Sequence, residues 1–136
     1  MTVAEYIKKH GIYTKYTKKI SLYNRDITSL EGLPFFKNLQ TLNLLKNHIK
    51  DINALFEHVT LKDLDLRDNP VTDIKGIEKL ELLEFLYLDV NKIEDISPIL
   101  KLSKLILINN LCESKINRFK RKIKYHKNIK LMLKIK

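Results

Sequence analysis

The eleven residues LQTLNLLKNHI at 39–49 recur along this chain, and that recurrence limits how it can fold. They return as LKDLDLRDNPV at 61–71 and as LEFLYLDVNKI at 83–93, and a partial copy, LSKLILINN, occupies 102–110. The asparagines of these copies lie 22, 22 and 19 residues apart. Self-similarity at such a period is typical of stacked repeats, in which each unit contacts only its neighbours.

A degenerate copy precedes these four. Positions 20, 42, 64 and 86 all carry leucine or isoleucine, and positions 27, 49, 71 and 93 carry isoleucine or valine, so the 22-residue spacing holds. Arg25 stands where the later copies have asparagine, and terminal repeats commonly depart from the consensus. We therefore expect about five repeats over residues 20–110.

Each copy contains the pattern leucine-x-leucine, which predicts a short strand. The leucines point into the stack and the residues beside them point outward, because side chains alternate along a strand. The asparagine that follows can turn inward and bond backbone groups that the turn leaves unpaired. We expect a structural ladder of four such residues: Asn47, Asn69, Asn91 and Asn110.

The return path of each repeat begins with a residue type that favours helix N-caps: Ser29, Asp51, Asp73 and Asp95. Each is expected to start a 3₁₀ or short helical turn on the convex side. The last copy is shorter, which places Leu105 beneath Leu86 in a 19-residue register. A 22-residue register with Leu105 beneath Leu83 is the alternative, but it loses the match that includes Asn110, so we prefer the shorter one.

Both ends of the stack carry predicted caps within a single domain, residues 1–136. Thr2 and Glu5 spell a capping box that opens a short helix, and Gly11 is placed to end it. Residues 1–19 are therefore expected to form an N-terminal helical cap, with an extra edge strand at 12–16. Residues 111–136 are expected to form a basic C-terminal cap made of a helix and a final strand.

The repeated unit resembles the 22-residue class of leucine-rich repeats shared by the nuclear regulator of protein phosphatase 1, bacterial internalins and the spliceosomal A-prime protein. Asn110 and Cys112, followed by Arg118 and Phe119, resemble the LRRcap that closes several of these proteins, although Leu111 stands where that cap usually has proline. The resemblance implies an α/β, right-handed solenoid with a parallel concave sheet of about five to seven strands, a 3₁₀ or short helical convex side, and helical caps at both ends. It implies protein recognition through the concave face without naming the partner.

The concave face is expected to carry large apolar side chains around an acidic group. The candidate protein-binding residues are Tyr23, Leu45, Asp63, Asp65, Arg67, Phe85, Tyr87, Asp89, Ile106 and Ile108. Lateral pairing of Lys62 with Glu84, Lys46 with Asp68 and Arg67 with Asp89 would neutralise several of the acids. That leaves Asp63 and Asp65 beside two aromatic rings, which favours a protein partner with a basic or mixed basic and apolar surface.

The net charge of +10 is concentrated at the two ends of the chain. Residues 1–19 carry +4 and residues 113–136 carry +9, whereas residues 20–112 carry −3. Any contact with a polyanion should therefore involve the ends. The possible nucleic-acid-binding residues are Arg118, Arg121, Lys122 and Lys124, whose alternative role is the solvated outer face of a capping helix.

Enzymatic, metal and cofactor chemistry have little support in the sequence. The four histidines are scattered without ligand spacing, the three glycines form no phosphate loop, and the single Cys112 has no second thiol. We expect no cofactor and no enzyme. No secretory signal or membrane span is predicted. We therefore expect a protein that does not contact membranes and acts in the cytoplasm or, if the source is eukaryotic, in the nucleus. We also expect a monomer.

Two functions follow from these expectations. The first is a non-catalytic interaction module that acts by occupancy, as an adaptor or a stoichiometric inhibitor, including one deployed between a phage and its host. The second is a nucleic-acid-associated ribonucleoprotein component that uses the basic C-terminal cap.

Overall fold

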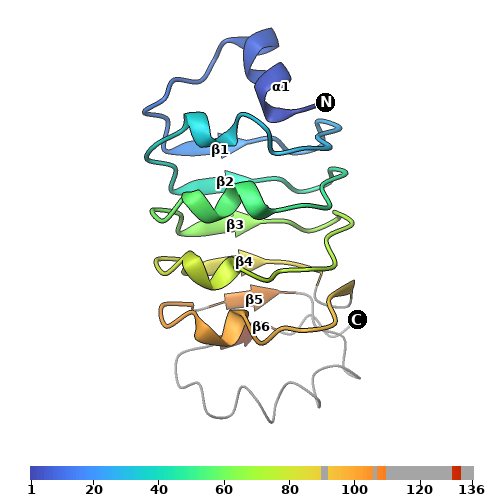
Figure 1. The fold of residues 1–136 in the computed structure, drawn as a ribbon, viewed down its shortest axis with the longest axis vertical. Coiled ribbons are helices and arrows are strands. Elements are labelled where there is room, and N and C mark those ends of the chain that lie inside the picture. Colours follow the sequence, from blue (N-terminus) through green and yellow to red (C-terminus); the bar gives the residue numbers. More distant parts are fainter. Residues whose placement is uncertain (90–91, 106, 110–129, 133–136) are drawn as a thin grey trace.

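The computed structural model describes residues 1–89, 92–105, 107–109 and 130–132 of the chain. It begins with one α-helix, α1 (Val3–His10). Six short strands then form one parallel sheet in chain order: β1 (Lys19–Ser21), β2 (Thr41–Asn43), β3 (Asp63–Asp65), β4 (Phe85–Tyr87), β5 (Leu107–Asn109) and β6 (Lys130–Met132). Short 3₁₀ helices lie on one side of this sheet (Figure 1): η1 (Leu33–Phe35), η2 (Asn53–Glu57), η3 (Ile77–Lys79) and η5 (Ile99–Lys101).

This architecture confirms the predicted solenoid with a parallel sheet and a 3₁₀ return path. Ile20, Leu42, Leu64 and Leu86 occupy equivalent positions in successive strands, as their 22-residue spacing requires. The predicted C-terminal helix lies outside the described residues. Among the described residues, no helix is both long and apolar enough to cross a bilayer.

The 19-residue register predicted for the last repeat is wrong. Phe85 pairs with Leu107 and Leu86 pairs with Ile108, so the spacing stays at 22 residues. Leu105 is buried in the position that Leu83 holds one repeat earlier. The apolar steps of three continue through Leu102 and Leu105 to Ile108, and the second leucine-x-leucine match was a coincidence of a leucine-rich segment. The evenly spaced hydrogen bonds of a parallel strand pair allow one register, and the pairing of β4 with β5 keeps the 22-residue spacing.

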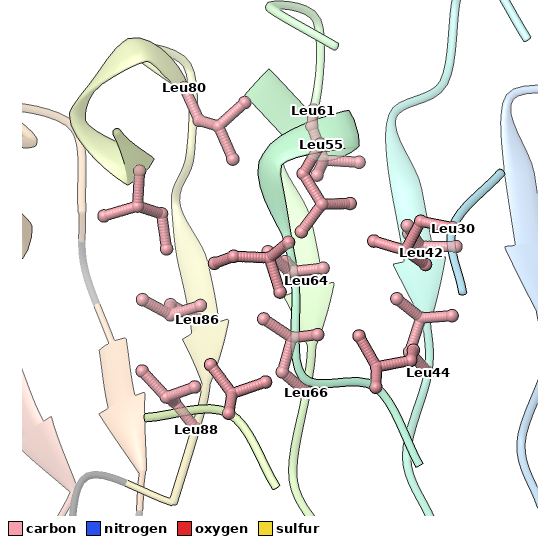
Figure 2. Close-up of a cluster of buried hydrophobic side chains, with 14 of the residues drawn as sticks. Leu30, Leu42, Leu44, Leu55, Leu61, Leu64, Leu66, Leu80, Leu86 and Leu88 are labelled. Carbon is pink, nitrogen blue, oxygen red and sulfur yellow. The ribbon is translucent and has the colours of Figure 1, made fainter. Parts of the chain in front are cut away.

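The core is a stack of buried aliphatic columns (Figure 2). Three leucines of repeat two, Leu39, Leu42 and Leu44, are each at most 1% exposed, and their counterparts in the next two repeats are equally buried. Burying one such side chain contributes about 1.5–3 kcal/mol. Because every repeat buries its leucines against its neighbours, stability comes from contacts between repeats.

Asn47 joins two repeats through four strong hydrogen bonds. Its Oδ1 accepts from the backbone N–H groups of Arg25 (3.1 Å) and Ile27 (2.9 Å) in the preceding repeat. Its Nδ2 donates to Leu22 O and to Leu44 O, both at 2.8 Å. Asn47 therefore bonds backbone groups of the repeat before its own. Repeat one follows only the N-terminal segment, and it carries Arg25 at the equivalent position.

Asn69 repeats this arrangement one step along the stack. Its Oδ1 accepts from Ile49 N (3.0 Å), and its Nδ2 donates to Leu44 O (2.8 Å) and Leu66 O (3.2 Å). The backbone turn just before each asparagine adopts positive φ, 57° at Lys46 and 54° at Asp68. Asn91 and Asn110 lie outside the described residues.

The residues that begin the return path form tight turns instead of capping the 3₁₀ helices directly. The side chains of Ser29, Asp51, Asp73 and Asp95 each accept a hydrogen bond from the backbone N–H two residues later, at 2.8–3.1 Å. The 3₁₀ helices start two to four residues further on. These side chains therefore fix the bend before each helix, a common use of such residues.

The N-terminal helix α1 lies against the first repeat (Figure 1). Its capping box is formed, since Glu5 N donates to Thr2 Oγ1 (3.0 Å) and Thr2 N donates to Glu5 Oε2 (2.7 Å). Val3 and Tyr6 are buried in the core. The edge strand predicted at 12–16 is absent, because Thr14 and Thr17 close a turn there through two mutual hydrogen bonds.

His58 is the one polar residue in an otherwise apolar column. Its equivalents are Phe36, Leu80 and Leu102, and it is 4% exposed with no hydrogen-bond partner at Nε2. Burial lowers the pKa of His58, opposed by the charge of Glu57, and Lys37 lowers it further. The folded chain therefore favours neutral His58.

Replacing Asn47 with alanine should lower the free energy of unfolding by about 2–4 kcal/mol, because buried backbone groups in two repeats lose their partners. Asn43→Ala is the matched control, since the Asn43 side chain accepts only one hydrogen bond, from Leu45 N, and should cost under about 1 kcal/mol. Urea denaturation measures both. Equal losses would contradict a bridging role for Asn47.

His58→Leu should remove part of the acid sensitivity of the fold. In the unfolded chain the imidazole takes up a proton below its ordinary pKa of 6.5, whereas the folded chain resists doing so. The free energy of unfolding should then fall below pH 6.5, by at most about 1.4 kcal/mol per pH unit for this group. Denaturation between pH 7.5 and 5 should show a shallower fall in His58→Leu than in the parent chain. An identical fall in His58→Leu and the parent would refute this role.

Candidate functional site

The outward face of β1–β4 holds most of the predicted binding residues. It is formed by three outward positions per repeat, here called the sheet face: Lys19, Ser21 and Tyr23; Thr41, Asn43 and Leu45; Asp63, Asp65 and Arg67; Phe85, Tyr87 and Asp89. Strand alternation places these side chains on the side opposite the buried leucines. Eight predicted residues, Tyr23 to Asp89, therefore lie on one surface.

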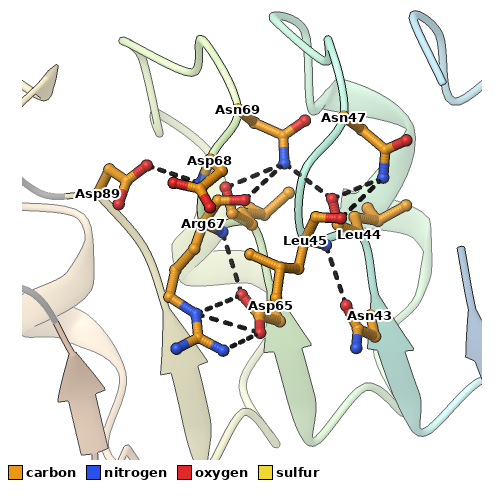
Figure 3. Close-up of polar contacts among 10 residues, drawn as sticks. Asn43, Leu44, Leu45, Asn47, Asp65, Arg67, Asp68, Asn69 and Asp89 are labelled. Atoms are coloured by element: carbon orange, nitrogen blue, oxygen red, sulfur yellow. Dashed lines mark hydrogen bonds and ion pairs between the residues drawn. The ribbon is translucent and has the colours of Figure 1, made fainter. Parts of the chain in front are cut away.

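Asp65 and Arg67 form an ion pair at the centre of the sheet face (Figure 3). Arg67 Nε donates to Asp65 Oδ1 at 2.9 Å, and Nη2 donates to Oδ2 at 2.5 Å. The backbone N–H of Arg67 also donates to Asp65 Oδ1 at 3.1 Å. The hydrogen bonds to Asp65 hold the pKa of Arg67 above its ordinary value, so the guanidinium stays charged.

Tyr87 extends this pair into the next repeat. The Arg67 guanidinium carbon lies 5.0 Å from the centre of the Tyr87 ring, within cation–π range. Asp65 is only 9% exposed, and Arg67 and Tyr87 are half-buried. The three side chains therefore hold one another in place before any partner arrives.

Two of the three predicted lateral ion pairs are not formed. Lys62 does pair with Glu84, at 3.7 Å. Arg67 pairs with Asp65 in its own repeat rather than with Asp89. Lys46 Nζ lies 5.9 Å from the centre of the Tyr23 ring instead of reaching Asp68.

Asp89 is instead bound at the strand exit. Its Oδ2 accepts from the backbone N–H of Asp68 at 2.7 Å and lies 3.5 Å from Lys92 Nζ. This carboxylate supports the left-handed turn at Asp68, whose φ is 54°. Asp89 therefore has a structural role that its sequence position did not indicate.

Asp63 and the apolar residues make up the rest of the sheet face. Asp63 accepts a hydrogen bond from Thr41 Oγ1 at 3.3 Å, so its expected isolation is wrong. Leu45 and Phe85 are half-buried, and Tyr23 is 44% exposed. The face thus combines apolar surface with carboxylates that are already hydrogen-bonded.

The remaining predicted site residues do not join this face in the described structure. Ile108 pairs with Leu86, so it does not hold the outward register position that the shorter spacing assigned to it. Ile106 and the four basic candidates, Arg118, Arg121, Lys122 and Lys124, lie outside the described residues. The role of Thr41 was missed and Lys46 was assigned to the wrong partner, because the contacts they make depend on side-chain geometry across repeats.

Among the described residues, no three His, Cys, Asp or Glu side chains gather into a group that could hold a metal ion. A shallow recess of about 260 Å³ lies at the turns after repeats two and three, lined by Lys50, Asp51, Ile52, Asn53, Asp73 and Lys75. Its two aspartates already accept backbone hydrogen bonds at 2.8 Å. We therefore assign the recess to turn structure.

Comparison with known proteins shows what these repeats are similar to. A family model described as leucine-rich repeats, in two copies, matches residues 59–101. A crystal structure of an internalin from Listeria monocytogenes, inlF, is similar with a TM-score of 0.68 and 34% sequence identity, over 74% of this chain and 29% of the internalin. This chain thus spans less than a third of that protein.

A second Listeria monocytogenes structure, internalin C2, is more distant, with a TM-score of 0.44 and 19% identity over 85% of this chain and 80% of that one. No curated protein matches the chain. The family match and the internalin-like fold agree with the asparagine ladder and the parallel strands described above. The chain is a leucine-rich-repeat protein.

Proposed function

We propose that this protein is a non-catalytic interaction module that binds a partner protein through its sheet face and acts by occupancy, as an adaptor or a stoichiometric inhibitor. The repeats and the internalin-like fold support a protein–protein interaction module. We further propose that the sheet face is the binding surface and that the protein acts inside the cell.

One observation carries the proposal: Asp65, Arg67 and Tyr87 are fixed to one another across two repeats. Aromatic and arginine side chains are the commonest hot spots of interfaces. Side chains that are already ordered lose little conformational freedom on binding, which favours affinity. Phe85, in the same strand as Tyr87, adds a half-buried ring beside them.

The charges on the sheet face indicate what kind of partner surface it can bind. Asp65 is neutralised by Arg67, and Glu84 lies near Lys62. Asp63 accepts a hydrogen bond from the Thr41 hydroxyl and forms no ion pair with another described residue. We propose a partner surface of mixed apolar and basic character whose basic group meets Asp63, rather than a strongly basic surface.

Phe85→Ala combined with Tyr87→Ala should abolish capture of the partner from a lysate of the source cells. Loss of two hot-spot rings typically weakens an interface by about thirtyfold or more. The tagged protein is used after nuclease treatment and at raised salt. Captured proteins are identified by mass spectrometry, and affinity is then measured with the purified partner.

The matched control is Phe56→Ala. Phe56 is half-buried like Phe85 but belongs to η2, on the side of the sheet away from the sheet face. It should retain the partner, and Arg67→Ala should lose most of the affinity. A partner that is lost on nuclease treatment and is indifferent to Phe85 and Tyr87 would reject the sheet face and favour the nucleic-acid alternative.

A further inference from the structure

Several exposed apolar side chains lie in neighbouring segments outside the sheet face. Five large apolar side chains are exposed in the described residues, and only Tyr23 belongs to the sheet face. The other four are Ile12 (65% exposed), Tyr16 (65%), Phe35 (49%) and Val59 (56%). All four precede a strand, in the segments that lead into β1, β2 and β3. We call these four residues the strand-entry edge.

Backbone contacts hold these segments side by side. Lys37 N donates to Lys15 O at 3.1 Å, and the rings of Tyr13 and Phe36 meet edge to face with centroids 6.1 Å apart. Thr60 Oγ1 donates to Leu39 O at 2.8 Å, which links the segment containing Val59 to the one before it. The segments that carry the strand-entry edge are therefore neighbours over three repeats.

Lysines surround the strand-entry edge. Residues 8–18 contain four lysines and no acidic residue, and all four lysines are exposed. Lys37 is also exposed, and Lys15 Nζ lies 5.0 Å from the centre of the Tyr16 ring. Two exposed acidic residues lie beside the strand-entry edge. Glu57 is one repeat beyond Phe35 and has the opposite charge to the lysines. Glu81 is one repeat beyond Val59, where the strand-entry edge ends.

We propose that the strand-entry edge is a docking surface for an anionic phospholipid membrane, distinct from the protein-binding sheet face. Exposed aromatic and aliphatic side chains ringed by lysines suit the boundary between headgroups and acyl chains, where rings and alkyl groups insert and ammonium groups meet lipid phosphates. Large apolar patches on a soluble surface commonly mark such interaction sites.

The chemistry favours lipid over nucleic acid. Ile12 and Val59 are aliphatic, so they offer no ring on which a base could stack. Residues 8–19 supply lysine and no arginine, the residue best suited to bidentate phosphate contacts. The four side chains are 49–65% exposed, which suits contact with a deformable lipid surface. We expected no membrane contact from the sequence, because these four residues come from three separate segments of the chain.

The test is sedimentation of the full chain with vesicles of phosphatidylglycerol and phosphatidylcholine in equal parts. The protein should bind these vesicles, bind poorly to phosphatidylcholine alone, and lose affinity as salt rises. Lys15→Glu with Lys37→Glu should weaken binding by at least about twentyfold, at about fivefold per lysine near an anionic surface. Ile12→Ser with Tyr16→Ser should weaken it by about tenfold or more.

Two controls separate this surface from net charge and from misfolding. Lys50→Glu with Lys75→Glu makes the same charge change at the opposite ends of the strands and should reduce binding far less. Glu57→Gln should strengthen binding by about fivefold, a gain that misfolding would not produce. Equal losses in the two lysine pairs, an unchanged affinity in Glu57→Gln, or binding only to single-stranded oligothymidylate would each overturn the proposal.

Discussion

The hydrogen bonds from the side chains of Asn47 and Asn69 to two successive repeats are the constraint on which the described structure depends. The turns after β1, β2 and β3 leave backbone N–H and C=O groups that the parallel ladder does not satisfy, and burying them unpaired costs about 1–3 kcal/mol each. Asn47 bonds such groups of its own repeat and of the one before it. An amide carries a donor and an acceptor on one short side chain, which suits it to both tasks. The bridging explains why the asparagine recurs with the period of the repeat and is absent from repeat one.

The same constraint sets what the sheet face presents. Strands locked in register by ladder and amide bonds place the outward residues in straight columns, so Asp65, Arg67 and Tyr87 meet from two repeats. Contacts between neighbouring strands then order side chains that would otherwise be free in water. The stacked repeats thus give the sheet face an ordered backbone. The residues that vary between the leucines determine which partner this face can bind.

The sequence predicted the repeat spacing, the strands, the 3₁₀ return path and the N-terminal capping box, because each depends on local pattern. It misplaced the last strand, since a segment with leucine or isoleucine at nearly every second position fits two registers and only the ladder to Phe85 selects one. It paired Arg67 with Asp89, whereas the backbone of Asp68 takes that carboxylate and leaves Arg67 to Asp65. The strand-entry edge was not predicted, because the segments that carry Ile12 and Phe35 are separate in the chain and become neighbours only in the fold.

Native-state hydrogen exchange of the Ile27 and Ile49 amides tests the bridging role of the asparagines most directly. Each of these N–H groups donates to an asparagine Oδ1 of the following repeat, at 2.9 and 3.0 Å. If the asparagines join the repeats, both amides should exchange as slowly as the ladder amides of Leu44 and Leu66, with opening free energies close to that of global unfolding. Exchange of Ile27 and Ile49 as fast as that of exposed turn residues would show that the bridges do not hold in solution and would contradict this account.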